Sequence, residues 1–385
     1  MSGDTVVLAG YLVRCPLGGY AWQVLHYLAG LRALGFDPYF YEDTAYYADC
    51  FDPATGNMHV GPDAGIAFAS DFFARFGFAD RWMFWDAGRD RYHGLNGAQT
   101  AAVLREARVV LTLAAVTRLA RQPGQRKVFI DIDPGFTQLR VAAGEAELCE
   151  LLAEHDRHFT IGENIGTPAC PIPTDRFEWL PTRQPIALDL WTPRPTDAHA
   201  AYTTIGRWDE QRRDVTFRGE VYTWRKRVEW MKFLDLPART GERFAPAMDI
   251  NTVPADAALL RRHGWEISDP IAASRDAMAY RDFICTSKGE FTVAKDLNVR
   301  LATGWFSDRG ACYLAAGRPV VTQDTGFGPG LPVGHGLFAV HGVDDAITAF
   351  AAIAADYGAH ARAARQVAVS NFDARRVLAD LFHRL

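Results

Sequence analysis

The sequence predicts an α/β fold of two domains, each built on a largely parallel sheet. Continuous apolar runs of strand length alternate with segments of helical spacing, the pattern of strands covered on both faces. A length of 385 residues also exceeds one ordinary core, given roughly 150 residues per domain. Prolines crowd residues 168–195, and neither helix interiors nor central strands tolerate them at that density. We therefore expect a first domain over 1–195, a second over 196–365, and a C-terminal helix over 366–385 that returns to the first domain.

The first domain opens with the clearest signal. Residues 5–10 are an apolar strand, a loop with Gly18 and Gly19 follows, and residues 20–34 have helical spacing and end at Gly35. With a strand at 37–42, this is a βαβ unit. The aperiodic stretch 43–65 is expected to be a long loop of the kind that carries function. The remaining elements are helix 66–76, strands 108–113 and 127–133, helix 140–154 and strand 158–162.

A second alternation of strands and helices begins after the proline-rich connector. We expect strands at 202–207, 244–250, 281–285, 319–322 and 337–340. The expected helices are 224–234, 255–263, 272–280, 307–316, 343–356 and those of the C-terminal segment.

Composition narrows the class of protein. A formal net charge of −5 argues against nucleic acid as the main partner, although local basic patches could bind a smaller anion. The six cysteines form no CxxC pair, which favours buried thiols in a reducing cytoplasm over disulfides or a structural zinc site. The N-terminus lacks the pattern of a signal peptide, and there is no run of eighteen apolar residues. We expect a cytoplasmic protein without a membrane span; its oligomeric state is left open.

Residues 306–328, FSDRGACYLAAGRPVVTQDTGFG, indicate a ligand site. Ser307 and Asp308 fit a helix N-cap, and the helix that follows is rich in small residues and ends at Gly317. Free N–H groups and the dipole at a helix start attract anions. A strand follows, and then a polar loop with Asp324, Thr325 and Gly326 emerges at the same edge of the sheet. The stretch predicts a phosphorylated ligand, although any α/β domain could contain such a unit for structural reasons alone.

Three runs carry a resemblance to a known family: GEFTVAK at 289–295, TGWFSDR at 303–309, and YLAAGRPVVTQDTGF at 313–327 with its GxPVV element. They resemble the C-terminal donor domain of GT-B glycosyltransferases, in particular bacterial glycosyltransferase-like members. The resemblance covers about residues 200–345 and is weaker over the N-terminal half. It implies two Rossmann-like domains facing each other across a cleft, with an acceptor site mostly on the first domain and a nucleotide-sugar donor on the second. It also implies catalysis without a metal or cofactor, and a UDP-sugar is the expected donor.

The resemblance also assigns donor-binding residues. The diphosphate would lie at Ser307, Asp308 and Arg309, near the loop of Asp324, Thr325 and Gly326, with Gly18 and Gly19 as the glycine-rich loop of the first domain. Family members use an Arg and a Lys on early elements of the second domain, for which Arg207 and Lys226 are the nearest matches and Lys295 a further choice. Many carry a glutamate where this chain has Cys312, so Asp308 is the substitute expected to hold the donor ribose.

Three residues are candidates for deprotonating the acceptor. Asp133 follows a predicted strand, although an Asp before a proline often only forms a turn. His155 and Glu163 belong to the densest titratable cluster of the first domain, and a histidine suits proton transfer near neutral pH. Either could instead be an ordinary surface group.

We therefore expect a metal-independent glycosyltransferase that uses a nucleotide-diphosphate sugar and a small-molecule or glycan acceptor. A sugar-nucleotide epimerase or hydrolase of the same fold, or a non-catalytic nucleotide-sugar-binding protein, are the alternatives.

Overall fold

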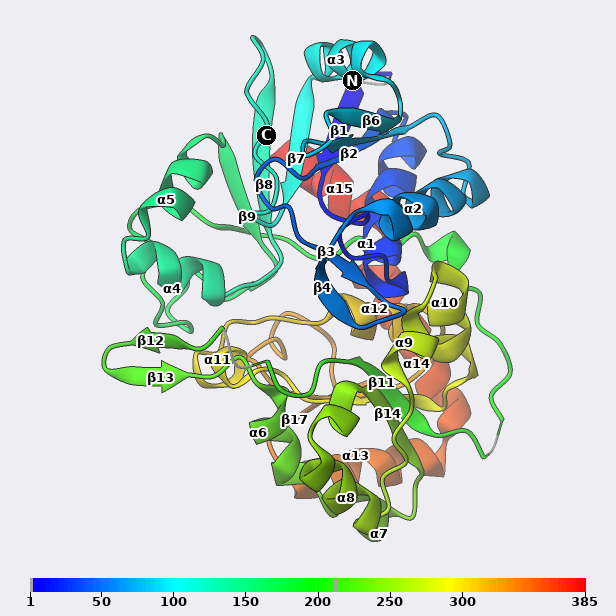
Figure 1. Ribbon diagram of the computed structural model, residues 1–385. Coiled ribbons are helices and arrows are strands. Elements are labelled where there is room, and N and C mark those ends of the chain that lie inside the picture. The colour runs from blue at the N-terminus through cyan, green and yellow to red at the C-terminus, as the bar shows by residue number, and fades with distance from the viewer. Residues whose placement is uncertain (1–2, 198, 211–212) are drawn as a thin grey trace.

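The computed structural model describes residues 3–197, 199–210 and 213–385. Its two lobes, each a sheet flanked by helices, lie one above the other in Figure 1. The N-terminal half of the chain forms the upper lobe, and most of the C-terminal half forms the lower lobe. Among the described residues no helix has the length and apolar character needed to cross a membrane.

The upper lobe contains the larger sheet. Within the described residues it has eight strands in the order β10-β9-β8-β7-β1-β2-β5-β6, parallel except for β6. The strands are β1 (Thr5–Ala9), β2 (Asp37–Asp43), β5 (Trp82–Asp86), β6 (Arg91–Gly94), β7 (Val109–Leu113), β8 (Arg126–Asp131), β9 (Arg157–Thr160) and β10 (Leu180–Pro181). The helices are α1 (Gly18–Ala33), α2 (Asp63–Arg75), α3 (Gly97–Glu106), α4 (Phe136–Ala142) and α5 (Ala146–Ala153), with a 3-10 turn at Leu188–Leu190. The loop expected at 43–65 contains a small hairpin of β3 (Cys50–Asp52) and β4 (Asn57–Val60).

The lower lobe has a five-stranded sheet within the described residues, all parallel, in the order β14-β11-β15-β16-β17. Its strands are β11 (Tyr202–Gly206), β14 (Phe244–Met248), β15 (Gly289–Thr292), β16 (Val320–Gln323) and β17 (Leu337–Val340), and β12 (Val215–Phe217) and β13 (Glu220–Tyr222) form a separate hairpin. The helices are α6 (Lys226–Trp230), α7 (Leu236–Thr240), α8 (Pro254–Arg262), α9 (Pro270–Ser274), α10 (Ala277–Thr286), α11 (Asp296–Arg300), α12 (Asp308–Ala315), α13 (Val343–Ala355) and α14 (Tyr357–Asn371), with 3-10 turns at Met231–Phe233 and Asp249–Thr252. The last helix, α15 (Ala374–His383), lies in the upper lobe.

Three element predictions were wrong, the first being the helix expected at 272–280, which is divided between α9 and α10. The strand expected at 281–285 is the second half of α10, and the strand of this region is β15. A short buried apolar run has no period that separates strand from helix, and here the Asp276 carboxylate caps the helix by accepting from Met278 and Ala279. The helix expected at 140–154 is two helices, α4 and α5, because Gly144 between them has a φ of 79°.

The two lobes share a continuous core. Helix α1 packs against α10 of the lower lobe, where the Trp22 indole donates to the Ala277 carbonyl at 2.7 Å. Helix α14 crosses α12, and the chain then returns to the upper lobe, where α15 lies against α1 (Figure 1). A Cβ on Gly30 would lie 2.6 Å from the Leu378 side chain, so this crossing needs a glycine. Packing between α1 and α10, together with the passage of α14 and α15 from the lower lobe to the upper one, thus holds the two lobes together.

Candidate functional site

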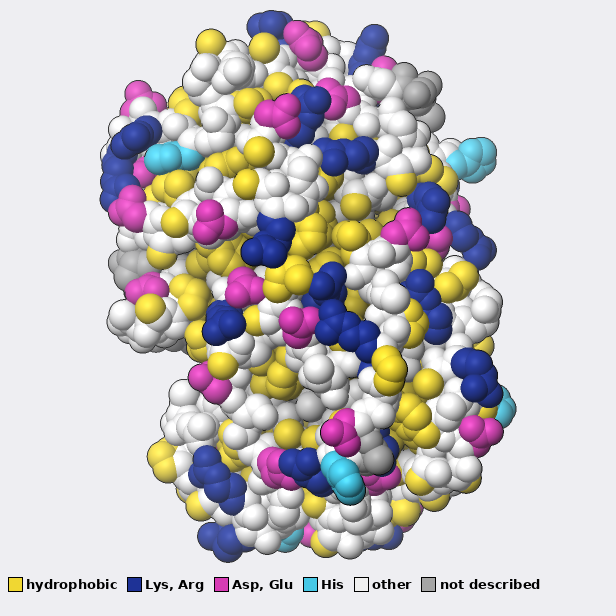
Figure 2. All heavy atoms as spheres, turned by 90° about the vertical axis from the view of Figure 1, so that its right-hand side faces the viewer, with side chains coloured by type: hydrophobic (Ala, Val, Ile, Leu, Met, Phe, Trp, Pro, Cys, Tyr) yellow, Lys and Arg dark blue, Asp and Glu magenta, His cyan; other side chains and the backbone are white. Residues whose placement is uncertain are grey.

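The carboxyl ends of the strands in the two lobes face each other. The loop after β8 brings Asp133 to Arg213 and Lys295 of the lower lobe. The segment after β9 also meets the lower lobe, where Gly162 and Trp305 form an isolated bridge. Ligands of open α/β sheets bind at these ends of the strands. Figure 2 views the molecule from the side of α2 and α10, where Lys and Arg side chains are visible near the level at which the lobes meet.

The first turn of α12 lies at this edge of the lower sheet. Ser307 is its N-cap residue, although its side chain accepts no hydrogen bond from the helix. The backbone ladder begins with the Ala311 N–H, which donates to the Ser307 carbonyl at 3.0 Å. The Asp308 carboxylate accepts from the Arg309 N–H at 2.7 Å, and burial raises the pKa of Asp308. One amide of the predicted anion site is therefore already bonded to an acidic side chain.

The Arg309 guanidinium points to the sheet below the helix. Its Nε donates to the fully buried Glu290 carboxylate of β15 at 2.5 Å, and its Nη1 donates to the Ile205 carbonyl at 2.5 Å. Thr204 donates to the same Glu290 oxygen at 2.9 Å. The second oxygen, Oε2, is buried without a hydrogen-bond partner in the described structure, next to Gly310. Arg309 thus neutralises a buried carboxylate.

Lys226 lies in this corner without a partner among the described residues. Carboxylates fix the segment before it, because Asp296 accepts from the Thr223 N–H at 3.0 Å and Asp214 from the Trp224 N–H at 2.9 Å. Lys226 itself is 9% exposed and makes no hydrogen bond or ion pair with any residue that the structure describes. Burial, followed by the charge of Arg309, holds its pKa well below the ordinary value. A buried ammonium without a counter-charge is costly unless an anion binds there.

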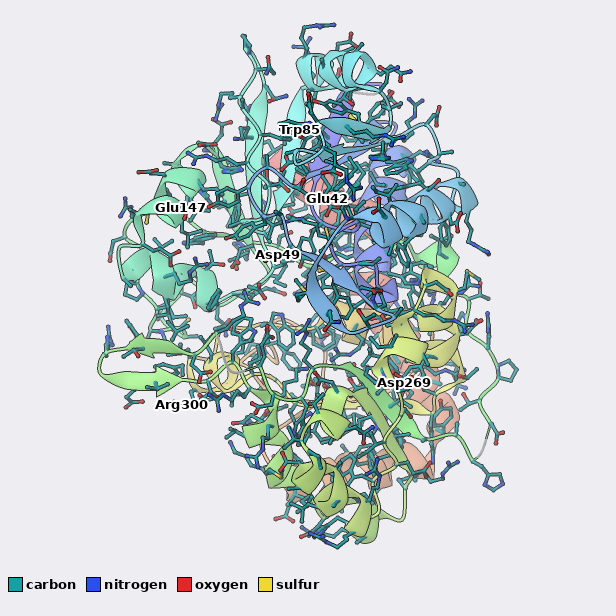
Figure 3. All side chains as sticks on the ribbon, viewed as in Figure 1. Glu42, Asp49, Trp85, Glu147, Asp269 and Arg300 are labelled. Atoms are coloured by element: carbon teal, nitrogen blue, oxygen red, sulfur yellow. The ribbon has the colours of Figure 1, made fainter. Side chains whose placement is uncertain are left out.

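Arg207 lies across from the loop that follows β1. It is exposed at the end of β11, and its charge acts on Cys15 and Tyr20 of the upper lobe. Burial raises the pKa of Cys15 to about 11, with Arg207 among the charges that oppose this rise. The buried Glu42 carboxylate (labelled in Figure 3) fixes the same loop, because it accepts from the backbone of Leu12, Val13 and Arg14 at 2.6–2.9 Å.

A second cluster of charged and aromatic residues lies beside the corner of Lys226 and α12. We call it the Asp133 cage, and it consists of Asp133, Phe136, Arg213, Trp224 and Lys295. Arg213 Nη2 donates to Asp133 at 2.9 Å, and Lys295 Nζ lies 3.9 Å from the other carboxylate oxygen. Lys295 Nζ also lies 3.1 Å from the centre of the Trp224 ring. The Arg213 guanidinium lies 4.5 Å from the Trp224 ring and 4.3 Å from the Phe136 ring. Aromatic faces therefore hold both cations in place.

The remaining predicted donor-site residues lie where the lobes touch. A Cβ on Gly18 would lie 2.4 Å from the Asp276 carbonyl, and one on Gly19 would lie 3.4 Å from the Tyr280 ring. Gly326 has a φ of 87° and packs against Asn164, which donates to its carbonyl at 3.0 Å. Thr325 donates to the Trp305 carbonyl at 2.6 Å, and Asp324 accepts from the Gly326 N–H at 2.9 Å. Packing and turn formation account for these residues without a ligand.

Two predicted bases are fully occupied by other groups. His155 lies under α5 with Nδ1 2.9 Å from the Leu151 carbonyl and Nε2 3.1 Å from Thr112 Oγ1, and burial lowers its pKa to about 3. Glu163 accepts from Arg183 through both oxygens, at 2.6 and 3.0 Å. Asp133, by contrast, faces the cations between the lobes.

Sequence reasoning missed Glu290 and Arg213 as parts of the site. Glu290 belongs to the run GEFTVAK, but a glutamate with no polar neighbour in sequence gives no sign that Arg309 and Thr204 meet it in space. Arg213 follows a strongly charged stretch that resembles any solvated segment. Among the described residues no three His, Cys, Asp or Glu side chains gather as a metal site would require, and the absence of a catalytic metal stays a prediction.

Comparison with known proteins places the fold. No protein-family model matches the chain, and no curated protein matches its sequence. An α-glucosyltransferase in complex with UDP and a 13-mer DNA containing a central A:G mismatch matches with a TM-score of 0.58 and 10% identity, over 100% of this chain and 99% of that one. HepE of Anabaena in complex with UDP-glucose matches with a TM-score of 0.56 and 10% identity, over 99% of this chain and 100% of that one. AviGT4, a glycosyltransferase involved in avilamycin A biosynthesis, matches at 0.54 and 13% identity, over 99% of this chain and 96% of that one. This chain has the GT-B fold of two Rossmann-like lobes.

Proposed function

We propose that this protein is a glycosyltransferase that moves a sugar from a nucleotide-diphosphate sugar to an acceptor hydroxyl. The observation that carries the proposal is Lys226, a nine-tenths buried ammonium with no partner in the described structure. It lies within electrostatic reach of Arg309 and Asp308, at the start of α12 and the carboxyl edge of a GT-B sheet. The donor diphosphate is the anion proposed to fill this corner.

The chemistry of sugar transfer fits such a corner. Cleaving the bond between sugar and diphosphate leaves negative charge on the departing phosphate, and fixed cations stabilise that charge in the transition state. Lys226 would contact the phosphates directly, and the helix start adds the positive end of its dipole. Arg207, exposed at the end of β11, and Lys295 would supply further positive charge, so no metal is required in this proposal.

The donor is proposed from the similarity of the fold to structures solved with UDP or UDP-glucose, and the acceptor from the net charge of this chain. UDP-sugars are the first donors to test, because HepE and the α-glucosyltransferase were each solved with UDP-glucose or UDP. The α-glucosyltransferase was also solved with DNA, whereas this chain carries a net charge of −5. A small-molecule or glycan acceptor, rather than DNA, is therefore proposed.

A binding screen followed by a turnover assay tests the function. We expect one of UDP, GDP or TDP to raise the melting temperature of the wild-type protein, because a ligand specific for the native state stabilises it. Lys226→Met should lose that shift, while Arg239→Met, which alters an exposed arginine paired with the exposed Asp344, should keep it. The matching nucleotide sugar should then be consumed only when an acceptor pool is present. Consumption without acceptor would instead indicate a hydrolase or epimerase, and tight binding without any turnover would indicate a non-catalytic binding protein.

A further inference from the structure

The Asp133 cage contains more hydrogen-bond donors than acceptors. Lys295 Nζ makes no hydrogen bond with the described residues, since its distance of 3.9 Å to Asp133 is too long for one. The indole N–H of Trp224 is buried and has no acceptor in the described structure. Asp133 is the carboxylate within ion-pair distance of both Arg213 and Lys295. The cage therefore resembles an anion site in which Asp133 is the carboxylate in ion-pair contact, while Glu210 acts on both cations only through its charge.

The cage adjoins the corner proposed for the donor. The charge of Lys295 is felt at Lys226, the unpartnered lysine by α12. Lys295 and Arg213 belong to the lower lobe and Asp133 to the upper lobe, so the anion that joins the two cations comes from the opposite lobe. Asp133 also acts electrostatically on Tyr11 and Tyr20 of the upper lobe.

We propose that the Asp133 carboxylate is an internal counter-ion that stands in for a phosphate of the donor, so that Arg213 and Lys295 exchange it for phosphate oxygens when the diphosphate binds. This inference rests on the proposed function, because it requires the diphosphate to bind at the adjoining corner. Asp133 thereby competes with the donor and couples donor binding to the contact between the lobes. It is not the acceptor base in this account.

The geometry favours exchange over a fixed structural bridge. Asp133 and Arg213 are each about 30% exposed at the side chain, so the pair is open to an incoming anion. The aromatic rings, rather than Asp133, hold both cations, since Trp224 is 2% exposed and contacts each of them. Removing the carboxylate should therefore leave the cations in place. A phosphate offers them more acceptor oxygens and more charge than a carboxylate does.

The test compares pyrophosphate and UDP binding by calorimetry in wild type, Asp133→Asn and Asp282→Asn. The control removes a carboxylate that also pairs with an arginine, Arg194, at 3.0 Å, but on the surface, and it changes the net charge equally. We expect Asp133→Asn to bind both probes about fivefold more tightly, the value of one partly exposed ion pair, and Asp282→Asn to match wild type. Uridine, which carries no phosphate, should bind wild type and Asp133→Asn equally.

The failures are distinguishable. Wild-type protein that binds neither pyrophosphate nor any nucleoside diphosphate would overturn the proposed function, and this inference with it. Wild-type protein that binds them, with no gain or a loss in Asp133→Asn, would overturn the counter-ion role alone. A gain that is equal for uridine would also overturn it, because a merely structural effect does not depend on the phosphates. Arg213→Gln provides the reciprocal check and should weaken pyrophosphate binding.

Discussion

Arg309 and Glu290 form a buried ion pair beneath the first turn of α12, with Nε 2.5 Å from Oε1. The arginine predicted to hold the donor diphosphate is thus committed to a carboxylate of β15, and a second contact ties it to the Ile205 carbonyl. The pair links the helix start to two strands of the lower sheet. Lys226, which has no such partner among the described residues, remains available to the ligand.

Glu290→Gln should destabilise the protein strongly. It would leave the Arg309 charge buried without a counter-charge, which typically costs about 3–5 kcal/mol. Urea unfolding measures the loss, with Glu266→Gln as the matched control. Glu266 pairs with Arg243 at the surface, where both side chains are about half exposed, so its loss should cost less than about 1 kcal/mol. Equal effects of the two substitutions would contradict the structural role of Glu290.

Lys226→Met should weaken donor binding without harming the fold. A hydrogen bond to a charged group contributes about 1.5–3 kcal/mol, so UDP should bind roughly ten- to a hundredfold more weakly. Stability should hold or rise, because the variant removes a buried polar group that has no hydrogen-bond partner among the described residues. Calorimetry with UDP and thermal unfolding of the same samples separate the two effects. Undiminished UDP affinity would place the diphosphate elsewhere.

Donor affinity should fall as the pH rises from 7 to 9. Burial lowers the pKa of Lys295 to about 8, although Asp133 raises it, so Lys295 is mostly charged at pH 7 and mostly neutral at pH 9. The phosphates stay ionised over this range, so attraction is lost from the protein side. A bound diphosphate favours the charged lysines, and binding should therefore take up protons, as calorimetry in two buffers would detect. Lys295→Arg should reduce the pH dependence, because arginine stays charged over this range. A UDP affinity of the wild-type protein that rises with pH would contradict the prediction.

Two neighbouring glycines should respond differently to alanine. A Cβ on Gly18 would overlap the Asp276 carbonyl at 2.4 Å and force α1 away from α10, at a cost of about 1–3 kcal/mol. On Gly19 the nearest atom, in the Tyr280 ring, is at 3.4 Å, so Gly19→Ala should be nearly neutral because alanine favours the helix. Denaturant unfolding of both variants checks this. Similar stability for both, with UDP binding lost, would instead support a phosphate-binding glycine loop.

Much of the fold is predictable from the sequence because its signals are local. The βαβ unit at residues 5–43 and the strand–helix order of the lower lobe follow from apolar spacing and from glycine stops such as Gly35 and Gly317. Local signals mispredict the second half of α10 as a strand, because it is a short buried apolar run. They also give no prediction over residues 82–106. In that range β5, β6 and α3 were not predicted at all.

The site is less predictable because its contacts join residues far apart in the chain. Lys226 and Lys295 were expected near the donor on family resemblance, but the sequence does not show that Asp133 meets Lys295 or that Trp224 lies under it. For His155 the sequence suggested a functional residue where the structure shows a structural one. A titratable cluster in sequence indicated a base, whereas the fold places both ring nitrogens in hydrogen bonds.

The most direct test of the central claim is a crystal structure of the protein soaked with UDP. Diphosphate density is expected at the first turn of α12, with a phosphate oxygen within hydrogen-bond distance of Lys226 Nζ. Nucleotide density at another place, with Lys226 still unpartnered and the corner closed by side chains, would contradict it.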